Sequence, residues 1–108
     1  MRKKILLPDG TVIRNMGIGT WYMGDLLSTR NEEIECIRYA LDNGINLIDT
    51  AEMYGNGNSE SLIGEAIRGY ERKSLFIVSK VLPSNAGRNR IFKSCENTLK
   101  RLGTNYLD

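Results

Sequence analysis

The sequence contains no histidine, only two cysteines and only two prolines. Cys36 and Cys95 lie far apart, with no Cys-x-x-Cys spacing and no histidine to join them, so no metal site and no disulfide framework are expected. We interpret both cysteines as reduced residues that pack within helices of a cytoplasmic protein.

Long apolar runs are also lacking, and none approaches the roughly 20 residues of a membrane span. The run 5–7 is too short for a signal peptide because Pro8 follows it directly. Fifteen basic and thirteen acidic residues are scattered along the chain and leave a net charge of +2, which predicts neither a nucleic-acid partner nor a membrane partner. The 108 residues, 41% apolar and 26% charged, are typical of one soluble globular domain.

Short apolar runs alternate with amphipathic stretches along the chain. A β-hairpin is expected over 4–13, with Pro8-Asp9-Gly10 as its turn. The pattern then predicts strands over 15–21, 45–49 and 75–78, helices over 31–43, about 58–67 and 88–102, and the start of a further strand at 106–108. This alternation is typical of an α/β fold in which helices cover a parallel sheet.

The expected helices carry apolar stripes at helical spacing and have recognisable ends. Asn58 or Ser59 is expected to cap the second helix, and Gly44 and Gly103 to end the first and third. The stripes are Ile34, Ile37 and Leu41, then Leu62, Ile63, Ala66 and Ile67, then Ile91, Cys95, Leu99 and Leu102.

Candidate functional residues follow the ends of the expected strands, where the loops of parallel sheets and barrels build their sites. Taken singly, Asp49 can anchor a loop, Tyr54 can pack and Lys80 can be solvated. Taken together, Asp49 can orient Lys80, whose charge can stabilise the tyrosinate form of Tyr54. A phenol pKa lowered from about 10 suits a general acid that protonates a carbonyl oxygen.

Carbonyl reduction also needs a hydride, which no side chain supplies, so a nicotinamide or a comparable carrier is required. Two segments, 17–19 and 55–57, begin like the Rossmann fingerprint. Both fail, since Tyr22 and Glu60 stand where the third glycine belongs.

Several motifs in order resemble the aldo-keto reductase family. Leu47-Ile48-Asp49-Thr50-Ala51, then Tyr54-Gly55, Ser59-Glu60 and Gly64, are similar to the family signature after the second barrel strand. Segments 16–21 and 99–104 fit as well. The resemblance implies the N-terminal part of a (β/α)₈ TIM barrel, with 1–108 forming a single incomplete barrel domain of a hairpin, three βα units and the start of a fourth strand.

The resemblance implies roles for the matching positions. Tyr54 would be the proton donor, Lys80 the partner that lowers its pKa, and Asp49 the carboxylate that pairs with Lys80 and lies near the nicotinamide ribose. Gly19 and Thr20 would approach the nicotinamide through backbone groups. Trp21 would line an apolar substrate pocket, although a large aromatic can also simply pack at a barrel mouth. The implied function is NADPH-dependent reduction of an aldehyde or ketone, with NAD left open.

Two features separate this sequence from the family pattern. The family's catalytic histidine after the fourth strand has no counterpart here, and the usual contacts to the cofactor phosphates lie beyond these residues. A barrel typically needs about 250 residues, so three units leave two sheet edges open and require self-association or repacking. Two alternatives therefore stand: an inactive half-barrel that self-associates or binds a complementary chain, and a small α/β domain in which Asp49, Tyr54 and Lys80 are structural.

Overall fold

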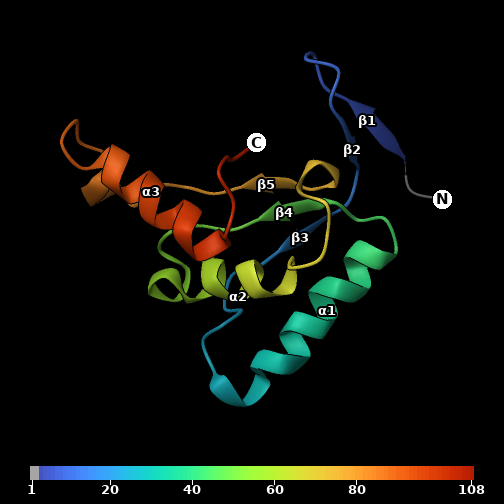
Figure 1. Cartoon of the computed structure of the whole chain (residues 1–108), viewed down its shortest axis with the longest axis horizontal. Helices are drawn as coiled ribbons and strands as arrows, with labels where there is room; N and C mark the ends of the chain where they lie inside the picture. Colours follow the sequence, from blue (N-terminus) through green and yellow to red (C-terminus); the bar gives the residue numbers. More distant parts are fainter. Residues whose placement is uncertain (1–2) are drawn as a thin grey trace.

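The computed structural model describes residues 3–108 and has two sheets and three α-helices in that range. The strands are β1 (Lys4–Leu6), β2 (Val12–Arg14), β3 (Gly17–Gly19), β4 (Leu47–Asp49) and β5 (Phe76–Val78). The helices are α1 (Arg30–Asp42), α2 (Asn58–Ala66) and α3 (Ile91–Leu102), with 3₁₀ turns η1 (Leu27–Thr29), η2 (Tyr54–Gly57), η3 (Arg72–Ser74) and η4 (Pro83–Asn85). In Figure 1 the helices lie on one side of the parallel sheet and the hairpin projects away from it.

The hairpin forms where the sequence predicts it, because its turn satisfies its own polar groups. The Asp9 carboxylate accepts the N–H of Thr11 at 2.9 Å, and Gly10 takes the positive φ of 90° that the turn requires. The N–H of Leu7 donates to Thr11 O at 2.8 Å and extends the pairing toward the turn.

The parallel sheet has the order β3-β4-β5, and its register aligns the carboxyl ends of the strands. Gly19 pairs with Asp49, and Asp49 pairs with Val78. The segments that leave the three strands therefore start at one edge of the sheet, which confirms a parallel sheet and brings the predicted site residues together.

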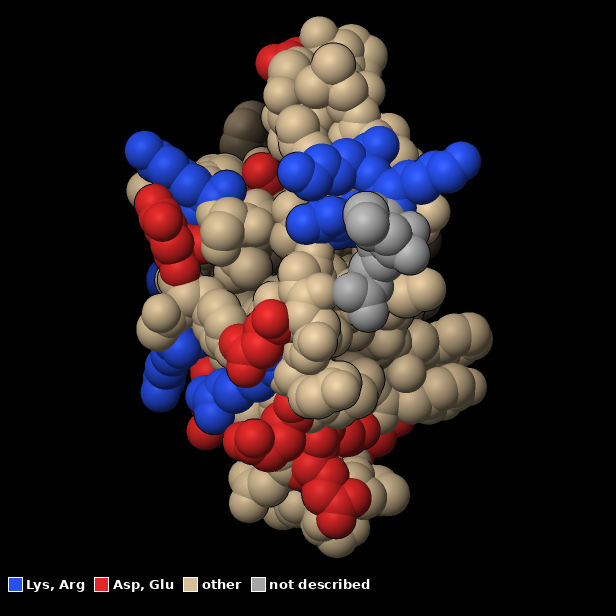
Figure 2. Space-filling model, turned by 90° about the vertical axis from the view of Figure 1, so that its right-hand side faces the viewer, with Lys and Arg blue, Asp and Glu red and all other residues tan. Residues whose placement is uncertain are grey.

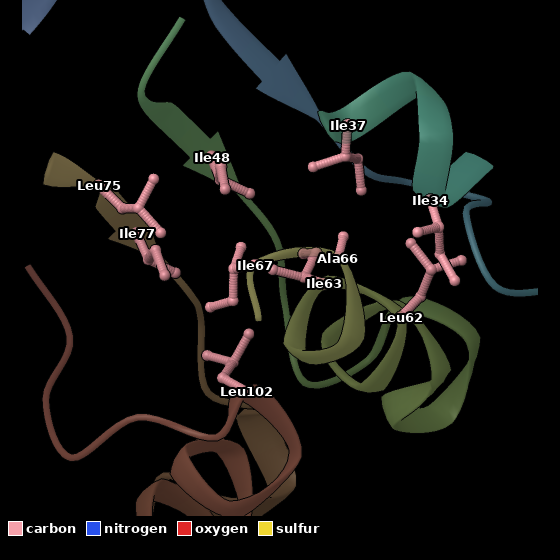
Figure 3. Close-up of a cluster of buried hydrophobic side chains, with 10 residues drawn as sticks. All are labelled: Ile34, Ile37, Ile48, Leu62, Ile63, Ala66, Ile67, Leu75, Ile77 and Leu102. Carbon is pink, nitrogen blue, oxygen red and sulfur yellow. The ribbon is translucent and has the colours of Figure 1, made fainter. Parts of the chain in front are cut away.

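The core lies between the sheet and the helices. Figure 3 shows branched side chains from α1, α2, β4, β5 and α3 converging on one cluster. The predicted inner face of α2 is buried throughout, and so are the first two members of the α1 stripe, with Leu41 partly buried. The clustered residues are Ile34, Ile37, Ile48, Leu62, Ile63, Ala66, Ile67, Leu75, Ile77 and Leu102.

The predicted inner face of α3 is wrong over its first two turns. Ile91 is 38% exposed and Cys95 is also exposed, whereas Ser94, Thr98 and Leu102 are buried. The hydroxyl of Ser94 donates to the Glu52 carboxylate, so a polar contact orients the start of the helix. Cys36 is exposed on α1 as well, and the packing role predicted for both cysteines is therefore wrong, although both are unpaired.

The element ends differ from the prediction in three ways. Helix α1 is shifted by one residue, α3 begins later, and the strands are shorter. No side chain caps α2: the helix follows Gly57 at φ 95°, and the Ser59 hydroxyl is directed to Thr20 instead. The glycine stops are confirmed, since Gly44 (φ 85°) and Gly103 (φ 69°) have left-handed backbones after α1 and α3.

The strand expected at 106–108 does not form. The Asp108 N–H donates to Ile77 O at 3.0 Å, but the Asp108 carboxylate accepts the Ile77 N–H at 2.9 Å, where a strand carbonyl would accept in a ladder. Arg72 fixes this arrangement through an ion pair with Asp108 at 2.8 Å and a hydrogen bond to Tyr106 O at 2.9 Å.

Basic and acidic side chains gather in separate patches on the face that Figure 2 shows. The largest group of Lys and Arg side chains lies toward the hairpin end, and the largest group of Asp and Glu lies toward the opposite end. In the first turn of α1, Glu32 and Glu33 interact favourably with the positive end of the helix dipole. Across residues 3–108, no helix is both long and apolar enough to cross a membrane.

Candidate functional site

The structure brings Asp49, Tyr54 and Lys80 together at the carboxyl edge of the sheet. The Lys80 Nζ donates to Asp49 Oδ1 at 2.9 Å, to the Thr50 carbonyl at 2.8 Å and to the Tyr54 hydroxyl at 3.4 Å. The side chains of Asp49 and Lys80 are each 47% exposed. The ammonium is therefore anchored on β4 while the pair stays open to a ligand.

Tyr54 reaches this position through a tight turn after β4. Its N–H donates to Ala51 O at 3.1 Å, and three consecutive residues then have positive φ: Gly55 at 58°, Asn56 at 55° and Gly57 at 95°. Glycine takes such conformations without steric cost, and asparagine tolerates them better than most residues. The Gly55-Asn56-Gly57 segment, which fails as a dinucleotide fingerprint, is thus the left-handed stretch that leads the chain from Tyr54 into α2.

The electrostatics of the cluster keep Lys80 charged. Partial burial of the Nζ acts to lower its pKa, but the hydrogen bonds and charges of Asp49 and Tyr54 outweigh that effect. The net result is that the pKa of Lys80 lies above its usual value of 10.5. At neutral pH the group that faces the Tyr54 hydroxyl is a fixed cation.

Aromatic rings stack beside the cluster. The Trp21 ring stacks on Tyr54 at 6.1 Å between centroids and on Tyr22 at 4.8 Å. Tyr22 has a φ of 72°, an unfavourable value for a bulky residue, and Trp21 is 64% exposed. Trp21 is therefore largely exposed, and its ring lies against the ring of Tyr54.

Gly19 and Thr20 have different environments although they are neighbours. Gly19 is exposed, and a Cβ placed on it would meet no atom within 4 Å, so the surface above its backbone is open. Thr20 is fully buried, and both its N–H and its hydroxyl donate to Asp49 O, at 3.2 and 2.9 Å. The structure thus places Gly19 at the surface of the site, whereas the side chain of Thr20 is buried.

Three buried polar residues near the site are not among the functional candidates predicted from the sequence. Ser59 and Thr50 are fully buried and bond to each other, and Ser59 also bonds to Thr20. Glu60 is also fully buried, with an ion pair to Arg101 at 2.7 Å and a hydrogen bond from the Ser79 hydroxyl at 2.7 Å. The sequence signal for these residues is a polar side chain directly after a strand or at the start of a helix. Their hydrogen-bond partners are distant in sequence, so the pairings themselves could not be predicted.

No metal centre accompanies these residues. Within 3–108, no three His, Cys, Asp or Glu side chains gather where they could hold a metal ion. What the residues do offer is a carboxylate, a fixed ammonium and a phenol beside an open glycine backbone and stacked aromatic rings.

Comparison with known proteins identifies the family of the chain. Residues 15–108 match the model of the aldo/keto reductase family. The chain belongs to that family. Methylglyoxal reductase YeaE of Escherichia coli is 45% identical over 109 residues, which cover 100% of this chain and 38% of the relative. Aldo-keto reductase YhdN of Bacillus subtilis is 41% identical over 111 residues, covering 92% of this chain and 34% of the relative.

A solved structure shows the same arrangement of the chain. The crystal structure of an aldo-keto reductase from Klebsiella pneumoniae in complex with NADPH superposes with a TM-score of 0.91 at 42% identity, covering 100% of this chain and 38% of that one. The fold is therefore the N-terminal part of the aldo-keto reductase barrel, as the sequence predicts. The chain spans little more than a third of the length of the relatives it matches.

Proposed function

We propose that this aldo-keto reductase segment carries the proton-transfer half of an NADPH-dependent oxidoreductase that reduces aldehydes or ketones to alcohols. The observation that carries the proposal is the contact of one ammonium, Lys80 Nζ, with both the Asp49 carboxylate and the Tyr54 hydroxyl. When bound, the nicotinamide supplies the hydride for the carbonyl carbon.

The chain's own residues divide the remaining work. Tyr54 donates its proton to the carbonyl oxygen as that oxygen becomes an alkoxide, and Lys80 stabilises the phenolate left behind. Asp49 holds Lys80 in place at 2.9 Å, so the charge is positioned before the reaction begins. Trp21 lines one side of the carbonyl site and shields it from water on that side.

The residues present fit the nicotinamide end of a cofactor. The open surface over the Gly19 backbone accommodates a flat ring close to β3, and the half-exposed Asp49 carboxylate can accept hydrogen bonds from a ribose hydroxyl. We assign these contacts to Gly19 and Asp49, and give Thr20 a supporting role because its polar groups are already bonded. We propose NADPH rather than NADH as the cofactor because the Klebsiella relative was crystallised in complex with NADPH.

The exposed cysteines support a reducing compartment, and we place the protein in the cytoplasm on that ground. The name of the Escherichia coli relative suggests methylglyoxal as the first probe substrate.

The test uses a chimaera in which these 108 residues replace the matching segment of the Escherichia coli relative, since that relative aligns over the whole chain. NADPH oxidation with methylglyoxal is followed in the chimaera and in its Tyr54→Phe variant. We expect turnover that falls by about 10²-fold or more in the variant, the range of general acid catalysis. Unchanged turnover would show that Tyr54 is not the proton donor.

The second candidate, an inactive half-barrel that binds another chain, is favoured by the unpaired outer edge of β3 within the described residues. NADPH binding to the 108-residue chain, measured by fluorescence quenching, separates the two. Binding supports the reductase, whereas a defined oligomer that does not bind NADPH, together with a chimaera that does not reduce methylglyoxal, supports the half-barrel.

A further inference from the structure

Three hydroxyls form a buried cluster directly below Asp49. Thr20 lies at the end of β3, Thr50 at the end of β4 and Ser59 in the first turn of α2, and each is fully buried. The Ser59 Oγ lies 3.1 Å from Thr50 Oγ1, 2.8 Å from Thr20 Oγ1 and 3.0 Å from the Thr20 carbonyl. Thr20 Oγ1 lies 2.9 Å from the Asp49 carbonyl.

Counting protons gives these bonds one direction. A hydroxyl has one proton to donate, and a carbonyl has none. The contact with Asp49 O therefore uses the proton of Thr20, and the single proton of Ser59 is shared between its two acceptors on Thr20, the carbonyl and Oγ1. Thr50 must then donate to Ser59, so the chain runs from Thr50 to Ser59 to Thr20 to Asp49 O.

The two ends of this hydrogen-bonded chain lie on either side of a single peptide bond. The chain starts on the side chain of Thr50 and ends on the carbonyl of Asp49, which belongs to the peptide bond between those two residues. The two flanking residues supply the acceptors of the Lys80 ammonium, the Asp49 carboxylate and the Thr50 carbonyl. A shift of this peptide would therefore move both acceptors together.

We infer that Ser59 is a positioning residue, the central link of a one-way hydroxyl chain that fixes the Asp49–Thr50 peptide and through it the Lys80 ammonium. Among the three hydroxyls, Ser59 is the one that contacts both threonines, so it joins α2 to the ends of both strands. Its effect on turnover rests on the function proposed above, but its effect on Lys80 does not.

The experiment measures the reactivity of Lys80 toward acetic anhydride in the 108-residue chain. Peptide mass spectrometry gives its acetylation relative to Lys100, an exposed lysine on α3 that normalises for reagent and for general unfolding. We expect Ser59→Ala to raise this ratio by about three- to tenfold. The displaced acceptors would stabilise the protonated amine less, so the pKa of Lys80 would fall, and each pKa unit changes the fraction of free amine tenfold.

Two further substitutions separate positioning from packing. Thr20→Val removes only the hydroxyl link and keeps the N–H bond to Asp49 O, so it should also raise the ratio, while Thr20→Ser should restore it. Ser61→Ala is the matched control on the same helix, and it should leave the ratio unchanged, since Ser61 lies outside the cluster.

The outcomes are decisive whether or not reductase activity is found. An unchanged ratio in folded Ser59→Ala, or equal ratios in Thr20→Val and Thr20→Ser, overturns the inference. If circular dichroism shows that Ser59→Ala does not fold, the Thr20 pair decides. Loss of fold in Ser59→Ala and Thr20→Val alike would also overturn it, because the cluster would then serve packing in general. If the inference holds, Ser59→Ala in the chimaera lowers kcat more than it changes KM.

Discussion

At the scale of single residues, the unequal contacts of Lys80 define how the site is built. Its ammonium lies 2.9 Å from Asp49 and 2.8 Å from the Thr50 carbonyl, but 3.4 Å from the Tyr54 hydroxyl. Two short bonds to β4 therefore anchor the charge, and Tyr54 is the looser partner. Catalytic hydrogen bonds are often long before a ligand binds and shorten in the reactive complex.

This anchoring predicts the effect of removing the charge. Lys80→Met in the chimaera should lower kcat/KM for methylglyoxal by about 10²- to 10⁴-fold, since the phenolate of Tyr54 would lose its stabilising cation. The melting temperature should change little because the side chain is half exposed. Lys93→Met, on the exposed face of α3, is the matched control. Full activity in Lys80→Met would contradict the mechanism.

Glu52 lies between Asp49 and Tyr54 in the sequence and supports the segments around the site. It accepts the Leu82 N–H at 2.7 Å, an amide hydrogen of Asn85 at 3.0 Å and the Ser94 hydroxyl. Burial alone would raise the pKa of Glu52, but these hydrogen bonds outweigh it and hold the pKa below its usual 4.5. Glu52 therefore links the segments after β4 and β5 to the start of α3.

The lowered pKa fixes the sign of a pH effect. The stabilisation by Glu52 is fully present above the unfolded pKa near 4.5 and is lost as the pH falls through the lower, folded value. Glu52→Gln should lower the free energy of unfolding at pH 7 by about 1.5–3 kcal/mol, the range for hydrogen bonds to a charged group. Urea titrations at pH 7 and pH 3 check this, since the variant should lose less stability between them than the parent.

The position of the site was predictable because the carboxyl ends of parallel strands lie at the same edge of the sheet. Asp49, Tyr54 and Lys80 follow consecutive parallel strands, so chain order places them at one edge. The supporting partners were not predictable in the same way: Ser59 and Thr20 meet only after α2 packs under the sheet. The pairing of buried Glu60 with Arg101 likewise joins residues 41 positions apart.

At the scale of elements, the packing of α2 on α3 depends on one glycine. A Cβ at Gly64 would lie 2.2 Å from Arg101 O and 3.1 Å from the carbonyl carbon of Leu102, so the backbones of the two helices approach more closely than any side chain allows. This contact brings Arg101 within reach of buried Glu60.

Gly64→Ala should therefore force the helices apart. Because the obstructing atoms belong to a backbone, we expect a loss of about 1–3 kcal/mol in the free energy of unfolding, the usual cost of overpacking. Gly87→Ala is the matched control, since a Cβ there meets nothing within 4 Å, and its effect should be neutral or slightly stabilising. Thermal unfolding of both variants gives the comparison, and equal melting temperatures would contradict the predicted clash.

Element types followed from periodicity, whereas the orientation of α3 did not. A stripe of Ile91, Cys95 and Leu99 satisfies helical spacing, yet the polar stripe of Ser94 and Thr98 is the buried one. Hydrogen bonds to Glu52 and Arg101 satisfy these two hydroxyls, and that compensation is invisible to a hydrophobicity pattern. The missing strand at 106–108 has a similar cause, because the Asp108 side chain occupies the position of a ladder carbonyl.

At the scale of the whole molecule, the sheet ends differently on its two sides. Asp108 partly covers β5 through its bonds to Ile77, whereas within the described residues β3 pairs with β4 alone. An apolar hollow of about 180 Å³ beside Lys80 also stays open, lined in part by Val81, Ile91, Cys95 and Leu107. Open strand edges and exposed apolar surface both favour association.

The 108-residue chain should therefore self-associate, and Ile91→Lys should weaken that association. Ile91 lies outside the core cluster and is 38% exposed, so a charge there should disturb the hollow more than the fold. Burying one large apolar side chain contributes about 1.5–3 kcal/mol, so the dissociation constant should rise roughly tenfold or more. Sedimentation velocity over a concentration series measures it, with Tyr39→Lys on exposed α1 as the control. A monomer at every concentration would contradict association. Equal weakening by both variants would show that the interface is not centred on the start of α3.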